Sequence, residues 1–136
     1  MINSKKRLKN RAGKLWKELI LKLHPYCEAC GKRATQPHHF FPKGLYGHLK
    51  LEPDNGIGLC VACHFARHHH GDPTIHQKII EKRGKGWYSY LLKMAREKPK
   101  GGFQTLGYYQ EQVHRFANML FVMKKYNYDK FLRDAE

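Results

Sequence analysis

Apolar residues recur every three or four positions over residues 5 to 23, a spacing that places them on one side of an α-helix. Lysine and arginine side chains fill most of the other side. Pro25 follows closely and cannot continue a helix. The pattern predicts one amphipathic helix with this inward stripe: Leu8, Ala12, Leu15, Trp16, Leu19, Ile20 and Leu23.

The second half of the chain has the same helical periodicity. Asp72 and Pro73 form a helix-start signal, an N-cap followed by proline in the first turn, and the helix should end near Arg83. Further helices are predicted over residues 87 to 97, 106 to 125 and 129 to 135. The inward residues are Trp87, Tyr90, Leu91, Met94 and Ala95 in the first of these, and Tyr109, Val113, Phe116, Ala117 and Leu120 in the second.

The middle of the chain has shorter patterns. Residues 37 to 41 and 56 to 59 suit short strands, and a helix should begin near residue 62 or 63 and end before Gly71. We therefore expect an α+β fold in one domain of 136 residues. Its parts are a basic N-terminal helix (5–23), a strand–strand–helix core (26–71) and a helical C-terminal extension (72–136).

The charge indicates a polyanionic partner. The chain has 26 Lys+Arg against 11 Asp+Glu, a formal net charge of +15. Nucleic acid, and DNA in particular, is the expected polyanion, with an acidic membrane surface as the alternative. No run of about 18 apolar residues predicts a membrane span, and lysines interrupt any signal-peptide core. We expect a cytoplasmic protein with reduced thiols, no membrane partner, and a monomeric or weakly dimeric state.

All four cysteines lie in two Cys-x-x-Cys pairs, Cys27 with Cys30 and Cys60 with Cys63. Two such pairs can complete a tetrahedral zinc site with Zn–S distances of about 2.3 Å. Disulfides and unpaired core cysteines are the alternatives, but two pairs in a small basic chain without a secretion signal favour zinc. Four protein ligands leave no position for water, so we predict a structural Zn²⁺ that joins two distant segments.

Seven of the ten histidines fall between residues 27 and 70, and some have the spacing of a second metal site. His38 and His39 are neighbours in a predicted strand, so their side chains should point to opposite faces. His64 and His68 are four residues apart and should project from one face of a helix. With His38 they can form an open three-histidine site, leaving positions for phosphate and water, while His39 acts nearby as a base.

The order of these motifs resembles the HNH endonuclease family, and more narrowly its zinc-containing members common in phages. Two Cys-x-x-Cys pairs enclose His38-His39, Asn55 follows downstream, and His64 comes directly after the last cysteine. The His-His pair and the His-x-x-x-His spacing also resemble the nuclease domains of bacterial colicins. The resemblance covers residues 27 to 70 and implies a ββα-metal (His-Me finger) core there, with the flanking helices packed on it.

The resemblance also implies a role for each motif residue. His39 matches the general base, and Asn55 matches the central Asn that holds the catalytic loop and the base. His38 and His64 match ligands of one catalytic divalent metal, and His68 matches a further ligand of the colicin-like members. Imidazole ligands tolerate Zn²⁺, Ni²⁺, Mn²⁺ or Co²⁺, and the open positions would also admit Mg²⁺. Many members have Gly-Gly between base and Asn; this chain lacks it, so the loop between the strands is expected to differ.

Each of these residues has a simpler interpretation when taken alone. His38 and His39 precede two phenylalanines and can be packing residues, Asn55 lies in an Asp-Asn-Gly turn signal, and residues 68 to 70 can be a solvated basic run. The order and spacing of the whole set favour the nuclease interpretation. The remaining histidines of interest are expected at the surface: His48, His69, His70 and His76.

Basic side chains of the first helix, the loops and the core helix are the candidate DNA contacts, although solvated charges are the alternative for each. They are Lys5, Lys6, Arg7, Lys9, Arg11, Lys43, Lys50 and Arg67.

We therefore expect an endonuclease that hydrolyses DNA phosphodiester bonds, by nicking or double-strand cleavage, with a divalent metal and a water activated by His39. An unperturbed imidazole pKa of about 6.5 makes a neutral base available near neutral pH. The main alternative is a non-catalytic zinc-knuckle nucleic-acid-binding protein. A metal-storage or metal-sensing protein is a second alternative, which gives no reason for Asn55 or for the positive charge.

Overall fold

In a computed structural model of the protein, residues 3–126 are described and form an α+β fold. The elements are α1 (Ser4–Leu23), β1 (Gln36–His39), β2 (Gly56–Leu59), α2 (Val61–His70), α3 (Pro73–Arg83), α4 (Lys85–Arg96) and α5 (Leu106–Lys125). Two 3₁₀ helices, η1 (Gly47–Leu49) and η2 (Pro53–Asn55), lie between the strands. The predicted helix over residues 129 to 135 lies outside the described residues.

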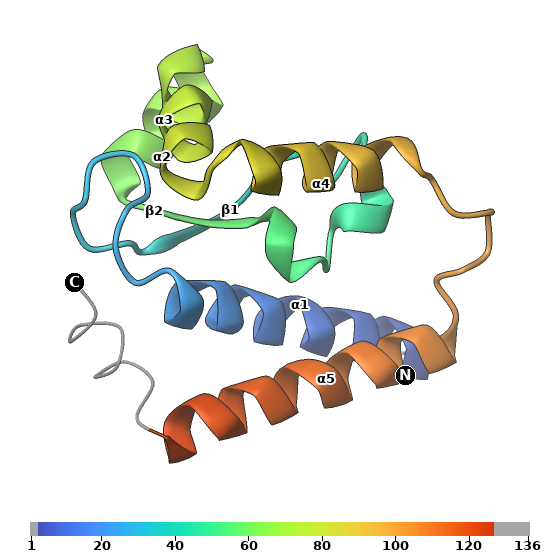
Figure 1. The fold of residues 1–136 in the computed structure, drawn as a ribbon. Helices are drawn as coiled ribbons and strands as arrows, with labels where there is room; N and C mark the ends of the chain where they lie inside the picture. The colour runs from blue at the N-terminus through green and yellow to red at the C-terminus, as the bar shows by residue number, and fades with distance from the viewer. Residues whose placement is uncertain (1–2, 127–136) are drawn as a thin grey trace.

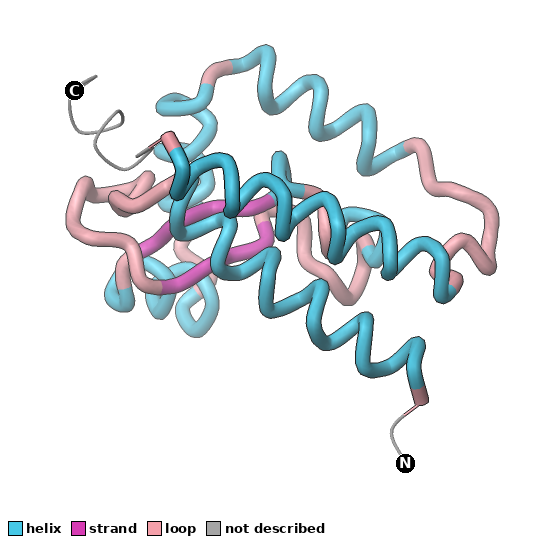
Figure 2. Tube along the Cα trace, turned by 90° about the horizontal axis from the view of Figure 1, so that it is seen from below, coloured by secondary structure: helices cyan, strands magenta, loops and turns pink. Residues whose placement is uncertain are grey.

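The two-stranded sheet lies between two groups of helices. β1 and β2 are antiparallel, with His38 opposite Ile57 and His39 opposite Gly56. On one side α1 and α5 lie next to each other and run in the same direction, while α2, α3 and α4 lie on the other side (Figure 1). Seen from below in Figure 2, α1 and α5 lie in front of the strands. The sheet therefore has both faces covered.

Helix α1 forms as its periodicity predicts. The Asn3 side chain caps its start by accepting a hydrogen bond from the Lys5 amide at 2.8 Å. Its apolar stripe is buried at Ala12, Trp16, Leu19 and Ile20, and packs with Tyr109, Phe116 and Leu51. The stripe thus anchors α5 as well as the sheet.

A second core fills the opposite side of the sheet, and its buried members include Phe40, Leu49, Ile57, Leu59, Ile75, Ile79, Leu91 and Ala95. The predicted start of α3 is confirmed, because the Asp72 side chain accepts a hydrogen bond from the Thr74 amide at 2.9 Å. The inward placement of Tyr90 is wrong, since its side chain is 57% exposed. Helix α4 buries the narrow stripe of Leu91 and Ala95, and Tyr90 lies outside it.

A buried ion pair ties the first cysteine pair to α3. The Glu28 carboxylate accepts hydrogen bonds from Arg83 Nε at 2.6 Å, from Arg83 Nη2 at 2.8 Å and from the Gly58 amide at 2.9 Å. Arg83 Nη2 also donates to the Gly56 carbonyl at 2.7 Å. One arginine thereby joins α3, β2 and the segment after Cys27.

Over residues 3–126, none of the helices has the length and apolar character that crossing a bilayer requires.

Two glycine substitutions should separate a packing constraint from helix propensity. A Cβ at Gly58 would lie 2.3 Å from the His24 carbonyl oxygen, whereas a Cβ at Gly13 meets nothing within 4 Å. Gly58→Ala should therefore lower the free energy of unfolding by about 1–3 kcal/mol. Gly13→Ala in α1 should raise it by about 0.5–1 kcal/mol. Urea denaturation checks both, and equal stability of Gly58→Ala and the parent would contradict the close approach.

Candidate functional site

The four cysteines form one cluster, as predicted. Cys27, Cys30, Cys60 and Cys63 have ligand atoms that all lie within 4.8 Å of one another. The sulfurs of Cys30 and Cys60 are 3.6 Å apart, against roughly 3.8 Å expected in a tetrahedral shell with 2.3 Å bonds. None of these cysteines is in a disulfide. The cluster can therefore hold a metal ion such as zinc.

Local backbone structure presents the sulfurs to this centre. Gly31 has φ +83°, which lets the chain turn tightly after the first pair. Cys60 is the N-cap of α2, and its sulfur accepts a hydrogen bond from the Cys63 amide at 3.4 Å. Burial alone would raise the pKa of Cys27, but hydrogen bonds from backbone N–H groups outweigh it and lower that pKa to about 7. At Cys27 this favours the thiolate, which is the form that binds metal, whereas burial raises the pKa of Cys63.

The imidazoles of His38, His64 and His76 lie together on the face of β1 that is turned toward α2 and α3. His38 lies with its Nε2 3.1 Å from Nε2 of His76, and its ring meets that of His64 edge-on, with centroids 5.4 Å apart. β1, α2 and α3 each supply one of these residues. In the described part of the chain, however, the cysteines are the only set of three or more candidate ligands whose atoms all lie within 4.8 Å. The histidines are thus neighbours rather than a closed ligand set.

His68 is not brought to His38. Its ring stacks on that of His64, with centroids 5.5 Å apart and an interplanar angle of 7°, and it is exposed at the end of α2. The helical spacing correctly predicts that His64 and His68 share a face. The spacing alone does not predict which of the two histidines faces β1.

The expected surface position of His76 is wrong. Its ring is partly buried and stacks on Phe40, with centroids 4.2 Å apart. Burial, followed by the positive charge of Arg67, lowers the pKa of His76 to about 4. Burial first, and then repulsion between its protonated ring and the protonated rings of His76 and His64, lower the pKa of His38 to about 3. Both rings are therefore neutral at neutral pH, the form that binds metal. Sequence reasoning missed His76 because only the packing of α3 against β1 places it here.

His39 is held by two contacts on the opposite face of β1. Its ring stacks on Trp16 of α1, with centroids 4.3 Å apart and an interplanar angle of 8°. Its Nε2 lies 2.9 Å from the Lys50 carbonyl oxygen, and because a carbonyl only accepts, Nε2 carries the proton. The unprotonated Nδ1 is then the basic atom. Burial first, and then the charges of Lys43, Lys50 and Lys17, lower the pKa of His39 although the hydrogen bond opposes them.

Asn55 does more than form a turn. Its side chain is completely buried, accepts a hydrogen bond from the Phe41 amide at 2.8 Å, and donates to the carbonyls of Phe41 at 3.1 Å and Leu49 at 3.2 Å. These bonds fix both ends of the 41–49 loop that leads to Lys50, whose carbonyl holds His39. Asn55 thus supports the orientation of His39 through the backbone.

Lysines surround the cleft beside His39. This cleft has a volume of about 320 Å³ and is lined by Lys9, Asn10, Gly13, Lys14, Trp16, Lys17, His39, Lys43, Lys50 and Leu51. Three of the predicted DNA contacts are here: Lys9, Lys43 and Lys50. Two further lysines, Lys14 and Lys17, were not among those predictions, although both are within two residues of Trp16.

The other predicted DNA contacts lie elsewhere. Arg67 is near the histidines, because its charge affects the pKa of both His38 and His76. The first turns of α1 carry the rest on exposed positions that do not line the cleft: Lys5, Lys6, Arg7 and Arg11.

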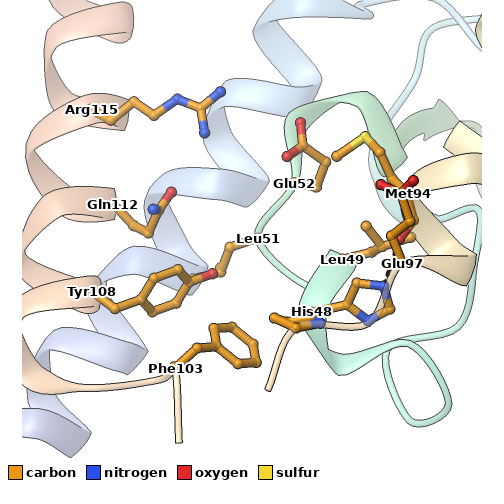
Figure 3. A pocket seen from close by; sticks show the side chains of 11 residues that line it. His48, Leu49, Leu51, Glu52, Met94, Glu97, Phe103, Tyr108, Gln112 and Arg115 are labelled. Carbon is orange, nitrogen blue, oxygen red and sulfur yellow. Dashed lines mark hydrogen bonds between the residues drawn. The ribbon is translucent and has the colours of Figure 1, made fainter. Parts of the chain in front are cut away.

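A separate cavity of about 390 Å³ opens between η1, α4 and α5 (Figure 3). His48 lies at its edge, is partly buried, and donates from Nε2 to the Met94 carbonyl at 2.9 Å. Glu52, Tyr108 and Arg115 also line this cavity, and burial raises the pKa of Glu52. None of the motif histidines 38, 39 and 64 reaches it.

In comparisons of sequence and of structure, no protein-family model, no curated protein and no solved structure matches this chain. The resemblance to HNH endonucleases therefore depends on the motif residues and on their placement.

Loss of one sulfur should remove the metal-dependent part of the stability. Cys60→Ser replaces a buried ligand that is also the N-cap sulfur of α2. Zinc should raise the melting temperature of the parent protein, whereas Cys60→Ser should show no cooperative transition with or without zinc. Thermal melts with zinc and with a chelator measure this. A sharp transition in the variant that does not depend on zinc would contradict a structural role for the cluster.

Proposed function

We propose that the protein is a metal-dependent endonuclease of the HNH type that hydrolyses phosphodiester bonds of DNA. In this proposal β1, β2 and α2 are the ββα-metal core, and the cysteine cluster holds a structural Zn²⁺. The observation that carries the proposal is the environment of His39. Its imidazole is fixed by Trp16 and by the Lys50 carbonyl, and it lies at a cleft lined by lysines.

His39 is the proposed general base. Proton transfer from water needs a neutral imidazole with a free nitrogen in a fixed position. The lowered pKa keeps the ring neutral, and the bond from Nε2 to Lys50 leaves Nδ1 to take the proton. The stacked Trp16 ring prevents His39 from turning toward α1. These features together suit a base better than a packing residue, which needs no defined tautomer.

The neighbouring histidines suit a divalent ion. His38 and His64 come from β1 and α2, are close in space, and have lowered pKa values that make neutral ligands available. Such an ion, when bound, supplies positive charge to the phosphate and to the leaving oxygen. β1 is an edge strand of the two-stranded sheet, so in this proposal a phosphate beside it contacts groups from both faces. His38 and His39 are also close enough for the charge of one to affect the other.

The lysine-lined cleft is the proposed path of the DNA backbone. Lys9, Lys14 and Lys17 come from α1, whereas Lys43 and Lys50 come from the loop that Asn55 fixes. Positive charges from two segments can neutralise consecutive phosphates and position the strand beside His39. Arg67, whose charge reaches His38 and His76, is the proposed contact to the scissile phosphate.

His39→Ala should abolish most cleavage without abolishing DNA binding. Loss of a general base typically costs about 10²- to 10⁴-fold in rate, so nicking of supercoiled plasmid should fall by that factor. The assay should include Mg²⁺, Mn²⁺, Ni²⁺ and Zn²⁺.

The matched control is His114→Ala, because His114 is an exposed histidine of α5. It should cut as the parent does. Equal cutting by His39→Ala and the parent would remove His39 from its role. A parent that binds DNA but does not cut it with any of the four metals would favour the non-catalytic alternative.

The double variant Lys17→Ala/Lys43→Ala should bind DNA more weakly. Each lost phosphate contact should reduce the slope of log K against log salt by about 0.9, so the slope should fall by up to about 1.8. Fluorescence anisotropy over a salt series measures this. Lys93→Ala on α4 is the control, because its side chain is 74% exposed and does not line the cleft. An unchanged slope in the double variant would place the DNA elsewhere.

A further inference from the structure

We propose that His76 is the third protein ligand of the catalytic metal, in the position that the sequence pattern assigns to His68. The role of this metal in cleavage rests on the proposed function, but its binding by His38, His64 and His76 does not. The ligand set would then come from one strand and two successive helices.

The separation of His38 and His76 fits a shared ion. Two ligands with bonds of about 2.1 Å are roughly 3.0 Å apart when adjacent in an octahedral shell and roughly 3.4 Å apart in a tetrahedral one. The two Nε2 atoms are 3.1 Å apart, between these values. An imidazole–imidazole hydrogen bond has the same length, so this distance permits a metal without requiring one.

The helix around His76 makes it a rigid ligand. Its neighbour Ile75 and the next-turn Ile79 are buried in the core, and the Asp72 cap fixes the first turn of α3. The His76 ring stacks on Phe40, which follows the two strand histidines directly. A residue that is held on both sides loses little conformational entropy when it binds an ion.

His68 lacks these properties. It is exposed in the last turn of α2, and its ring contacts are to His64 and His69. To reach His38 it would have to pass the His64 ring, on which it is stacked.

His64 completes the set by a change of side-chain rotamer. Its ring nitrogens make no hydrogen bond to residues 3–126, and its ring already lies 5.4 Å from that of His38. Three imidazoles leave the remaining coordination positions for water and phosphate oxygen. Arg67 lies beside the pair and can balance the charge of that phosphate.

The test uses the full-length protein with its cysteine cluster loaded with one equivalent of Zn²⁺. A second equivalent of Zn²⁺ is added, and the imidazole nitrogen resonances are followed by NMR. Coordination should shift the Nε2 signals of His38 and His76 and a ring nitrogen of His64, while His68 and the control His114 should not shift. Movement of His68 in place of His76 would overturn the inference. This experiment needs no substitution and therefore does not depend on a variant folding.

Substitution gives a second measurement. In calorimetric titrations with Ni²⁺, His76→Gln and His38→Gln should each weaken the tightest site by more than the roughly 10- to 100-fold typical of losing a second-shell partner. His68→Gln and His114→Gln should leave that site unchanged. Unchanged Ni²⁺ affinity in a folded His76→Gln protein would refute the assignment.

The two proposals fail separately. Metal binding that depends on His76 in a protein that cuts no DNA would leave the ligand assignment intact and defeat the nuclease proposal. Cleavage of DNA by the parent, together with an unchanged Ni²⁺ affinity in His76→Gln, would support the nuclease proposal and refute the ligand assignment.

Discussion

Neighbouring side chains of a β-strand leave it on opposite faces, and the arrangement of this candidate site depends on that constraint. His38 and His39 are consecutive, yet one packs with histidines of α2 and α3 and the other with Trp16 of α1. Each ring therefore has its own environment and its own supporting helix. A one-residue shift of β1 against β2 would exchange the two environments and bury the wrong ring against α1.

Three structural features maintain the pairing register of β1 and β2. The cysteine cluster brings the segment before β1 to the start of α2, directly after β2. At the other end of the strand pair, the Asn55 side chain forms hydrogen bonds with the backbone at both ends of the 41–49 loop. Gly56, opposite His39, leaves space that a larger residue could not, because a Cβ there would lie 2.1 Å from Ile20 Cδ1. Helix α1 can consequently approach the sheet closely enough for Trp16 to contact His39.

The sequence predicts most elements, because their signals are local. Periodicity identifies α1 and α5, Asp72-Pro73 marks α3, and two Cys-x-x-Cys pairs predict the cluster. What it does not predict are contacts between elements that are far apart along the chain. His76 is such a case, since nothing near it indicates that α3 folds over β1. Lys14 and Lys17 are another: on a helix with so many basic residues, only the position of the cleft distinguishes them from Lys5 or Arg11.

The Glu28–Arg83 pair has a consequence for how the cysteine cluster and the neighbouring histidines relate. Glu28 directly follows Cys27, and Arg83 is the last residue of α3, the helix that carries His76. The carboxylate is almost fully desolvated, so separating it from the guanidinium is costly. Disorder at the sulfurs must therefore propagate into α3. An ion at the cysteine cluster and an ion at the proposed histidine site would therefore be thermodynamically linked, and by reciprocity each would strengthen binding of the other.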